Sequence, residues 1–407
     1  MTWPVVSLSS ALESAEVFVD GDWVESKDQD PNGDARLIQL ADVGDGEYFD
    51  KSERFLTTGK ARKLKCTFLK KGDVLIARMP DPLGRACIFP GDPKPSVTVV
   101  DVCIVRPNGR GPDARWLMHC LNSPTCRNQI AGFATGTTRS RISRTNLAKI
   151  KIPFPPLPEQ RRIAEVLDLV EALRAKRRVA LAQLDALTQS IFLDLFGDPA
   201  TNPKGWRSDK LAAFCDLMNG FAFRSSDYVE LSGTLNCRMS NIRPNGEFDI
   251  DYNPKYLPDH FAQEYKNYAL RDGDVIIAMT DMATEPKILG VPTVVMTKGK
   301  TLLLNQRVGK LVIEDPDSLL FSYLKQLLTQ PYVKKYYKRF AGGGVQINLG
   351  KGDLLSVNVV VPPSSLQREF ARRVQAVEKL KTAQRASLAE LDALFASLQT
   401  RAFKGEL

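Results

Sequence analysis

Residues 155–196 read PPLPEQRRIAEVLDLVEALRAKRRVALAQLDALTQSIFLDLF, and this stretch determines how the rest of the chain is organised. It contains no glycine, and its prolines stand only at the start. Apolar residues recur every seven positions, at Ile163, Val170, Leu184 and Ile191. A heptad pattern sustained over about four heptads predicts one long helix with a single apolar seam.

A second copy of this pattern occupies residues 362–407, where an apolar residue again recurs at the heptad positions. Arg177 interrupts the first series, and Gln384 interrupts the second at the matching place. Two matched seams predict that the helices pair with each other. The residues expected to pair are Ile163, Val170, Arg177, Leu184, Ile191, Phe370, Val377, Gln384, Leu391 and Leu398. The alternate seam positions are expected at Val166, Leu173, Ala180 and Leu187, and in the second copy at Leu380 and Leu394.

The segments before each helix are also copies of one another. Residues 69–79 read LKKGDVLIARM and residues 270–280 read LRDGDVIIAMT, an offset of 270 − 69 = 201. Short β-branched runs alternate there with Gly, Pro and Asp turns, which indicates a mixed α/β domain rich in irregular strands. The expected fold class is α+β, with two similar α/β domains separated by two long antiparallel coiled-coil helices. The predicted boundaries are 1–154 and 197–361 for the mixed domains, and 155–196 and 362–407 for the helices.

The topology follows from lengths. A helix of ~38 residues is ~57 Å long, whereas a domain of ~165 residues has a radius of gyration near ~15 Å and termini that often lie close together. The second helix is therefore expected to begin near the end of the first and to run back antiparallel, with one domain at each end. Arg177 and Gln384 would then face each other and specify the register. The alternative is that both are tolerated, partly exposed polar residues.

Composition narrows the class of protein. Lys and Arg outnumber Asp and Glu by 56 to 47, a net charge of +9, which favours an anionic partner, with nucleic acid ahead of a membrane surface. A hydrophobic fraction of 43% excludes wholesale disorder. We expect no membrane span, because no run of ~18 apolar residues occurs, and no signal peptide at the N-terminus. The seven cysteines form no CxxC pair and are expected to be reduced and buried in a cytoplasmic protein.

The run IPFPPLPEQRRI at residues 152–163 resembles the join between target-recognition domain and helix in specificity subunits of type I restriction–modification enzymes. The GDVLIA and GDVIIA segments are also similar to that family, as are the helices with Trp116 and Tyr323 and the Phe-Ala-x-Gly loops at Phe133 and Phe340. The resemblance covers essentially the whole chain. The second copy departs from it at residues 362–367, PPSSLQ, where a leucine replaces Glu159 of the first copy.

The resemblance implies a DNA-binding subunit that does no chemistry itself. Each recognition domain would read one half of a split sequence in double-stranded DNA, and the paired helices would set the spacer. Two modification (methyltransferase) subunits would dock on the helices, and restriction/translocase subunits would complete the complex. No cofactor and no membrane partner is expected.

A search for catalytic motifs agrees with that expectation. The two histidines and the cysteine spacing match no zinc site, and no HExxH, GxSxG or Walker signature is present. Asp274 with Glu285 and Lys287 loosely mimics a nuclease cluster, but the partner of Glu285 in the first copy is a glycine. Two alternatives remain open: a self-sufficient restriction endonuclease on related recognition domains, and a coiled-coil assembly protein that never reads DNA.

Candidate DNA contacts come from loops near the helix junctions and strand ends, where side chains with guanidinium, amide, hydroxyl or ammonium groups suit phosphates and base edges. Each has an ordinary solvated surface position as its alternative. The candidates are Gln39, Arg78, Thr138, Arg139 and Arg141 in the first copy, and Arg224, Arg238, Lys334, Lys335, Gln346 and Asn348 in the second.

Overall fold

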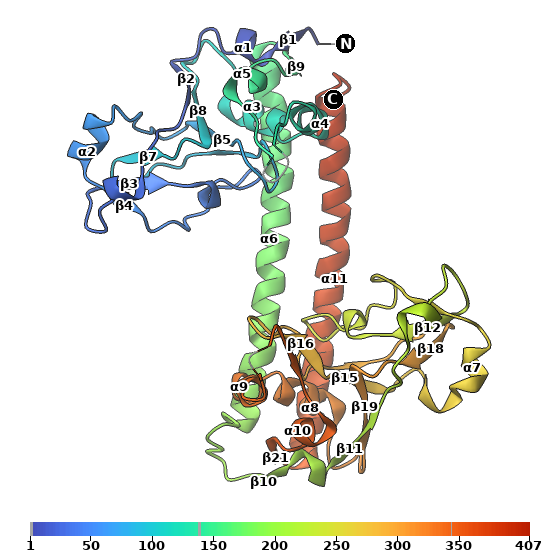
Figure 1. Cartoon of the computed structure of the whole chain (residues 1–407). Helices are drawn as coiled ribbons and strands as arrows, with labels where there is room; N and C mark the ends of the chain where they lie inside the picture. Colours follow the sequence, from blue (N-terminus) through green and yellow to red (C-terminus); the bar gives the residue numbers. More distant parts are fainter. Residues whose placement is uncertain (1–2, 137–139, 343) are drawn as a thin grey trace. The chain divides into compact units, whose positions relative to one another are not determined.

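The computed structural model describes residues 3–136, 140–342 and 344–407, and it divides into two compact units (Figure 1). The first unit takes Met1–Val179 with Gln384–Leu407, and the second takes Ala180–Ala383. The division falls inside the two long helices. Each unit therefore combines one mixed domain with a segment of both helices, and the domain boundaries expected from sequence stay a prediction.

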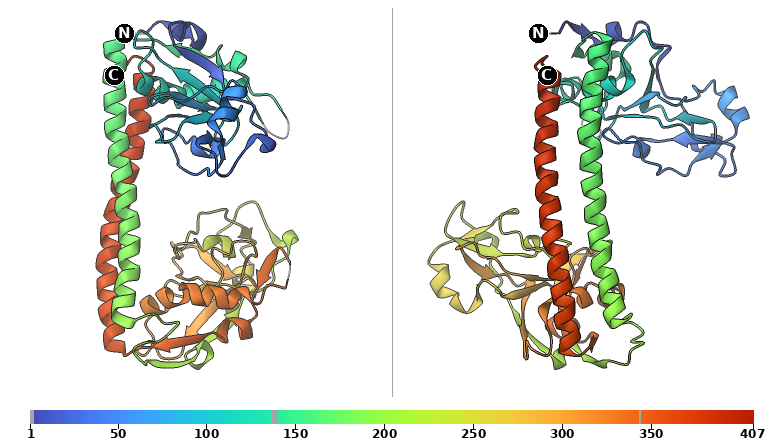
Figure 2. Two further views of the ribbon diagram at one scale, coloured as in Figure 1. Left: turned by 90° about the vertical axis from the view of Figure 1, so that its left-hand side faces the viewer. Right: turned by 180° about the vertical axis from the view of Figure 1, so that it is seen from behind.

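The long helices are α6 (Leu157–Phe196, 40 residues) and α11 (Ser364–Ala402, 39 residues), and within each unit their segments lie side by side (Figure 2). They run antiparallel. In the first unit Arg162 Nη2 donates to the Leu407 carbonyl at 3.0 Å, and Arg174 Nε donates to Asp392 Oδ1 at 2.6 Å. In the second unit Lys381 pairs with an aspartate of α6 at 2.8 Å. The antiparallel coiled coil of the expected fold class is confirmed.

The main seam uses the expected heptad series, whose members are all buried or half-buried: Ile163, Val170, Arg177, Leu184, Ile191, Phe370, Val377, Gln384, Leu391 and Leu398. Arg177 Nη1 donates to Gln384 Oε1 at 3.2 Å, so these polar side chains lie opposite each other. Residue 402 ends α11, earlier than expected, because Gly405 takes a φ of 77° and turns the chain out of the helix.

The second row of the seam differs from the expectation. Leu173, Leu187, Leu380 and Leu394 are 37–54% exposed, so these four alternate positions lie largely outside the interface, whereas the expected Val166 and Ala180 are half-buried. The interface instead uses positions four residues after that series, which are buried or half-buried: Leu167, Arg174, Leu181, Thr188, Leu195, Val374, Lys381, Leu388, Phe395 and Ala402. Several of these are polar, so the helix pair buries less apolar surface than a leucine-rich coil.

Among the described residues the first mixed domain builds two larger sheets, with strand orders β2-β8-β5-β6 and β4-β3-β7, and a two-stranded pair, β1-β9. Its elements are β1 (Val5–Ser7), α1 (Leu8–Ala11), β2 (Val17–Asp20), η1 (Ser26–Asp28), β3 (Ala35–Ile38), η2 (Leu40–Asp42), β4 (Phe55–Leu56), α2 (Thr58–Lys63), β5 (Val74–Ala77), β6 (Ala86–Ile88), β7 (Ser96–Thr98), β8 (Val102–Arg106), α3 (Ala114–Leu121), α4 (Pro124–Gly132), α5 (Arg144–Leu147) and β9 (Lys151–Pro153).

The second mixed domain repeats this plan, with strand orders β11-β19-β15-β17 and β13-β12-β18-β14. Its elements are β10 (Arg207–Lys210), η3 (Leu211–Ala213), β11 (Cys215–Asn219), η4 (Ser225–Asp227), β12 (Thr234–Cys237), η5 (Met239–Asn241), β13 (Tyr256–Leu257), α7 (Phe261–Glu264), η6 (Lys266–Tyr268), β14 (Ala269–Leu270), β15 (Val275–Ala278), β16 (Thr280–Met282), β17 (Pro292–Val294), β18 (Thr301–Leu304), β19 (Val308–Ile313), α8 (Phe321–Leu328), α9 (Pro331–Lys338), β20 (Gln346–Asn348), α10 (Lys351–Leu355) and β21 (Asn358–Val361).

The repeated Gly-Asp-Val motif begins a central strand in each domain. Gly72 adopts a φ of 94°, a conformation that glycine takes without strain. The next residue, Asp73, accepts the Lys70 N–H at 2.8 Å and pairs with Arg106 of the neighbouring strand β8. The second copy places a glycine at a φ of 89° in the same turn and pairs the following aspartate with a lysine of β19. In both copies the aspartate of the motif thus closes the turn by a hydrogen bond and pairs with a cation of the neighbouring strand.

Each domain packs on the long helices through one buried aromatic side chain. Trp116 of α3 lies in a cluster that includes Ile163 of α6 and the C-terminal part of α11. In the second unit Tyr323 of α8 stacks on Phe192 at 5.6 Å between ring centroids and meets Phe370 of α11 in the same cluster. These side chains are fully buried. The long helices are therefore part of each domain's core.

One described helix, α6, contains an 18-residue window with a mean hydropathy of 1.3, so by length and composition alone it is able to cross a membrane. A single helix of this kind is weak evidence for a span. Phe192 and Phe196 near its end are buried in the core of the second unit.

Candidate nucleic-acid interface

A group of turns surrounds one end of the β3/β7 strand pair in the first domain. Strands β3 and β7 are parallel, so their carboxyl ends meet at the same edge. Gln39 directly follows β3, and its N–H donates to Asp42 Oδ2 at 2.7 Å. Asp101 lies in the turn that follows β7, and Glu25 begins the short helix η1. Loop ends of this kind place polar side chains at the edge of a rigid sheet.

These turns enclose a pocket of about 450 Å³. Glu25, Gln39, Asp101 and Arg54 bring hydrogen-bonding groups to its wall, and Trp23 adds an aromatic face. Trp23 is 69% exposed, and its indole N–H donates to Glu25 Oε1 at 3.2 Å. An exposed aromatic beside acceptors and a guanidinium suits contact with a flat, polar ligand such as a nucleobase edge.

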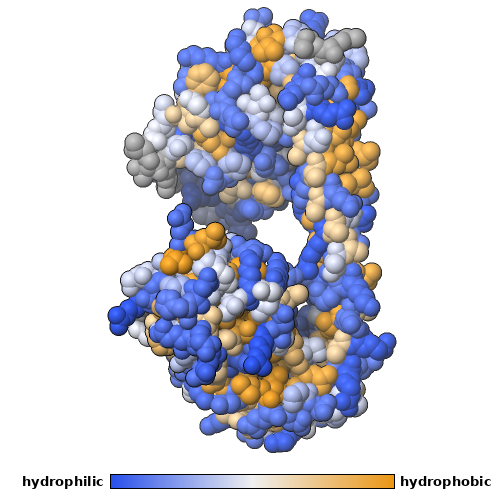
Figure 3. Space-filling view, turned by 90° about the vertical axis from the view of Figure 1, so that its right-hand side faces the viewer, coloured by the Kyte–Doolittle hydropathy of each residue, from blue (hydrophilic) through white to orange (hydrophobic). Residues whose placement is uncertain are grey.

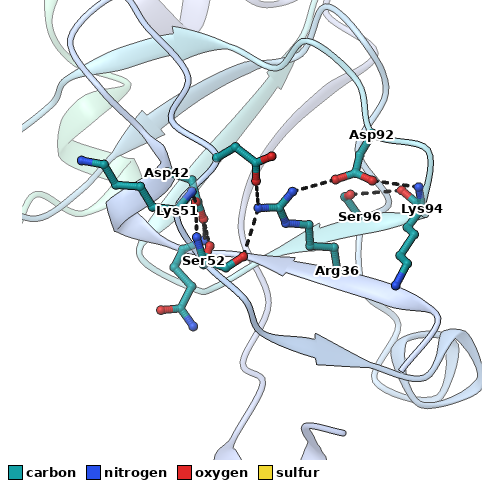
Figure 4. Close-up of polar contacts among 9 residues, drawn as sticks. Arg36, Asp42, Lys51, Ser52, Asp92, Lys94 and Ser96 are labelled. Atoms are coloured by element: carbon teal, nitrogen blue, oxygen red, sulfur yellow. Dashed lines mark hydrogen bonds and ion pairs between the residues drawn. The ribbon is translucent and has the colours of Figure 1, made fainter. Parts of the chain in front are cut away.

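Hydrogen bonds hold the residues behind the Gln39 turn, and Figure 4 shows those of Asp42 and Arg36. Asp42 is fully buried and accepts the N–H groups of Lys51 at 2.9 Å and Ser52 at 2.8 Å in addition to that of Gln39. Arg36 of β3 donates to Asp92 Oδ2 and to the Ser52 carbonyl, each at 3.0 Å. The turn that presents Gln39 is therefore held from several sides.

The equivalent place in the second domain carries Arg238, which directly follows β12. Its N–H donates to Asn241 Oδ1 at 2.8 Å, as the Gln39 N–H does to Asp42. One guanidinium nitrogen of Arg238, Nη1, is buried without a hydrogen-bond partner among the described residues. A buried, unpaired donor is costly unless a ligand satisfies it.

The loop before the first helix junction is bound to the sheet. Arg141 Nη2 pairs with Asp101 Oδ1 at 2.8 Å, and the Arg141 side chain is 43% exposed. Thr138 and Arg139 lie outside the described residues. Arg78 is 4% exposed; its Nη2 donates to the Val100 carbonyl at 2.6 Å. Arg78 thus holds the turn at Val100 through this hydrogen bond. A direct contact between Arg78 and DNA stays a prediction.

In the second domain the matching loop forms strand β20, which pairs with β16. Asn348 is exposed and accepts the Thr280 hydroxyl at 2.8 Å, and Gln346 is half-buried and accepts from Arg307 Nη1 at 3.4 Å. Sequence reasoning missed Arg307. The structure thus brings together Gln346 and an arginine from a different turn.

The other candidates of the second domain are less concentrated. Arg224 is exposed at the start of η4. On α9, Lys335 is exposed, whereas Lys334 is half-buried and lies 3.5 Å from the Lys287 carbonyl. Arg339 covers the Tyr336 ring at 3.5 Å from its centroid. The two lysines present positive charge on one helix, which suits phosphates better than bases.

A second pocket, of about 560 Å³, lies within the first unit between α3, α6 and α11. His119 Nε2 lies 2.7 Å from Asp168 Oδ1, and Arg115 Nη1 donates to Asp168 Oδ2 at 3.1 Å. Burial alone would raise the pKa of Asp168, but the hydrogen bond from His119 and the charge of Arg115 outweigh it, so the pKa lies below its usual value. The ion pairs tie the first domain to α6.

Replacing Asp168 by Asn tests this tie. A carboxyl with a lowered folded pKa stabilises the fold above its unfolded pKa of ~3.9 and loses that effect as the pH falls further. We expect D168N to lower the unfolding free energy of the first unit by ~0.2–1 kcal/mol at pH 7, the range of partly exposed ion pairs. Denaturant titrations at several pH values measure the difference, which should vanish once the pH lies below the lowered pKa of Asp168. A difference that persists there would contradict the assignment.

The described residues contain no group of three or more His, Cys, Asp or Glu side chains that could hold a metal ion. The aspartate of the loosely nuclease-like set, Asp274, accepts the Arg271 N–H at 2.9 Å and pairs with Lys310 at 2.7 Å. It therefore serves the turn before β15, while Glu285 pairs with Lys287 at 3.6 Å.

The comparisons with solved structures concern the fold. One structure, from a study of complex assembly and conformational transition of the type I R-M system, covers all of this chain with a TM-score of 0.57 at 22% identity, and this chain covers 98% of it. The type I restriction-modification S subunit from M. genitalium matches 99% of the chain with a TM-score of 0.55 at 14% identity, with 96% of that chain covered. The two-domain, two-helix fold is therefore shared with these proteins.

The comparisons of sequence concern the family. The MjaVIII specificity subunit of Methanocaldococcus jannaschii is 24% identical over 60% of this chain and 59% of its own length, and the EcoKI specificity subunit of Escherichia coli is 24% identical over 72% and 65%. The matches thus span less than two thirds of these relatives. The family model for the type I restriction modification DNA specificity domain matches residues 3–183 and 203–392. Since both matches together cover most of the chain, it belongs to the type I restriction modification DNA specificity family.

Proposed function

We propose that this chain is the DNA-reading subunit of a type I restriction–modification complex and does no chemistry itself. Each mixed domain, residues 1–154 and 197–361, reads one half of a split sequence in double-stranded DNA. The observation that carries this is the duplicated edge: Gln39 and Arg238 stand on the same turn in the two domains but differ in side chain. Because the turn is the same in both domains while its side chain differs, the two domains suit two different half-sites.

The helix segments 155–196 and 362–407 set the distance between the half-sites in this proposal. Their antiparallel pairing in each unit and the Arg177–Gln384 contact give the pair a defined register. Polar contacts at such positions specify one alignment over shifted ones. A fixed register makes the separation of the two readers constant, as a spacer of fixed length requires.

The outer surface of the helices supports docking of partner subunits. Figure 3 shows hydrophobic side chains gathered on the surface of the long helices. Leu169 and Val179 of α6 are 64% and 56% exposed, and Leu380 of α11 is 54% exposed. Exposed apolar stripes mark interaction sites. We assign these stripes to two methyltransferase subunits, with restriction/translocase subunits completing a complex on DNA in the cytoplasm.

Modification mapping of host DNA tests the proposal. When the gene is present with its methyltransferase subunits, we expect a methylated motif of two short half-sites separated by a fixed spacer; without the gene the motif should disappear. The complex should also bind DNA with a strong salt dependence, the logarithm of affinity falling by about 0.9 per phosphate contact for each decade of salt. An unchanged methylation pattern with salt-independent binding would favour an assembly protein, and cleavage by the chain alone would favour the endonuclease.

A further inference from the structure

At the equivalent sheet edge the first domain carries acidic and amide side chains and the second carries arginines. Backbone hydrogen bonds show which residues of the two domains are equivalent. The first matched position follows the parallel strand. The Gln39 N–H donates to Asp42 Oδ2 at 2.7 Å, and the Arg238 N–H donates to Asn241 Oδ1 at 2.8 Å. Asp42 and Asn241 close the same turn, so Gln39 and Arg238 are equivalent.

The second matched position begins a short 3-10 turn. The Asp28 N–H donates to the Glu25 carbonyl at 2.9 Å, and the Asp227 N–H donates to the Arg224 carbonyl at 3.0 Å. In return Asp28 Oδ2 and Asp227 Oδ2 accept the N–H of the first residue of each turn. The capping aspartate is thus the same in both copies, while the residue that the turn presents changes from Glu25 to Arg224.

The third matched position lies in the turn between the two sheets. The Arg78 N–H donates to the Asp101 carbonyl at 2.9 Å, and the Met279 N–H donates to the Arg307 carbonyl at 3.0 Å. Asp101 and Arg307 are therefore equivalent. In the first domain the three matched residues, Glu25, Gln39 and Asp101, line one pocket.

A fourth position on the same edge does not change its charge. The Leu37 N–H donates to the Arg54 carbonyl and the Asn236 N–H to the Lys255 carbonyl, each at 2.9 Å. Arg54 and Lys255 are thus equivalent cations, and Arg54 lines the pocket. Phosphate contacts carry no sequence information and suit a position that stays basic, whereas base contacts vary with the sequence read.

We propose that these matched residues form a reading triplet in each domain. Glu25, Gln39 and Asp101 accept hydrogen bonds from the exocyclic amino groups of adenine or cytosine in the major groove. Arg224, Arg238 and Arg307 donate to the acceptor atoms of guanine. Carboxylates accept from the cytosine amino group, amides pair with adenine, and arginine forms bidentate bonds with guanine, so the exchange of side chains is an exchange of preferred base.

The environment of each triplet agrees with its role. The Glu25 side chain is 45% exposed and that of Asp101 is 24% exposed, so both carboxylates are accessible from the pocket, and Arg141 orients Asp101. Arg224 and Arg307 are exposed, while Arg238 keeps a buried donor unpaired among the described residues. Guanine O6 and N7 would supply the missing acceptors.

This inference rests on the proposed function, and exchange variants separate the two. Q39R and R238Q each install the residue of the matched position. With the methyltransferase subunits present, we measure the methylated motif and select bound sequences from a randomised duplex library. We expect Q39R to convert one adenine- or cytosine-preferring position of one half-site to guanine, and R238Q to lose a guanine preference in the other half-site. Each change should be roughly 5- to 150-fold at that position, with the spacer unchanged.

Two further variants complete the set, with K255A as the control. R224Q alters an exposed member of the triplet, and it should relax a guanine position in the same half-site as R238Q does. K255A should weaken binding to all sequences equally. If the wild type yields a bipartite motif that Q39R, R238Q and R224Q all leave intact, the triplet is wrong and the proposed function stands. If the wild type yields no motif, the proposed function fails and the triplet with it.

Discussion

Removing one heptad from each long helix should shorten the spacer of the DNA target by about three base pairs. Deleting residues 178–184 of α6 and 377–383 of α11 takes out one complete layer, because Leu184 and Val377 occupy the heptad series that flanks the Arg177–Gln384 contact. Seven residues at 1.5 Å each shorten the pair by ~10 Å, or about three steps of ~3.4 Å. The seam residues on either side keep their register.

The motif methylated in host DNA measures the result. Both half-sites should keep their sequences while the spacer contracts. Three base pairs also rotate one half-site by about 100° relative to the other, since DNA turns once in 10–10.5 base pairs, so we expect weaker binding as well. Deleting only residues 178–184 mismatches the two helices and should abolish binding instead. A full-length spacer in the double deletion would refute the role of the helices as a ruler.

Replacing Asp73 by Ala should destabilise the first unit by about 3–5 kcal/mol, since removing one partner of a buried ion pair strands the other. The Asp73 side chain is 1% exposed and that of Arg106 is 11% exposed. Arg106 Nε and Nη2 each donate to this carboxylate at 2.7 Å. The variant leaves a guanidinium inside the domain with only the Phe68 carbonyl and Glu16 near it.

The matched variant D274A removes the same turn contact in the second unit. There Lys310 is 25% exposed and Asp274 is 16% exposed, so water screens the orphaned ammonium. We expect a smaller loss of roughly 1–3 kcal/mol, the range of a hydrogen bond to a charged group. Hydrogen exchange of the β5 and β15 amides reads the two units separately. Equal losses would show that the turn, and not the buried guanidinium, carries the effect.

The fold was largely predictable because duplication makes its pattern visible twice. The heptad series, the antiparallel pairing and the two mixed domains were expected, and the helices α3 and α8 lie where Trp116 and Tyr323 indicated. The second row of the seam was wrong for a physical reason. In α6 the four expected positions three residues after the heptad series are all apolar, whereas the positions four residues after it include Arg174 and Thr188, so apolarity alone favoured the wrong row.

The candidate interface was predicted only in part. Gln39 and Arg238 were recognisable because each directly follows a clear strand. Asp101 and Arg307 were not, because the offset between the copies changes from 279 − 78 = 201 to 307 − 101 = 206 before that turn, and only the hydrogen bonds show which residues correspond. Glu25 was missed because no strand ends directly before it. Arg78 carries a charge that suggested the surface, but it follows a fully buried strand, and its guanidinium is held inside by Val100 and Asp20.

Each unit contains a helix segment from the other half of the sequence, and this affects the order in which the units fold during synthesis on the ribosome. Phe395 and Leu398 of α11 pack against the cluster around Trp116, so the N-terminal unit lacks part of its interior until the last helix has been translated. At ~5–20 residues per second the wait is roughly 10–50 s. The C-terminal unit has a much shorter delay, because Phe192 is made before the domain that covers it and Phe370 follows directly after that domain. In a nascent chain the C-terminal unit should therefore fold first. In a product truncated before α11, the N-terminal unit should expose apolar side chains of its incomplete core and be sensitive to proteases.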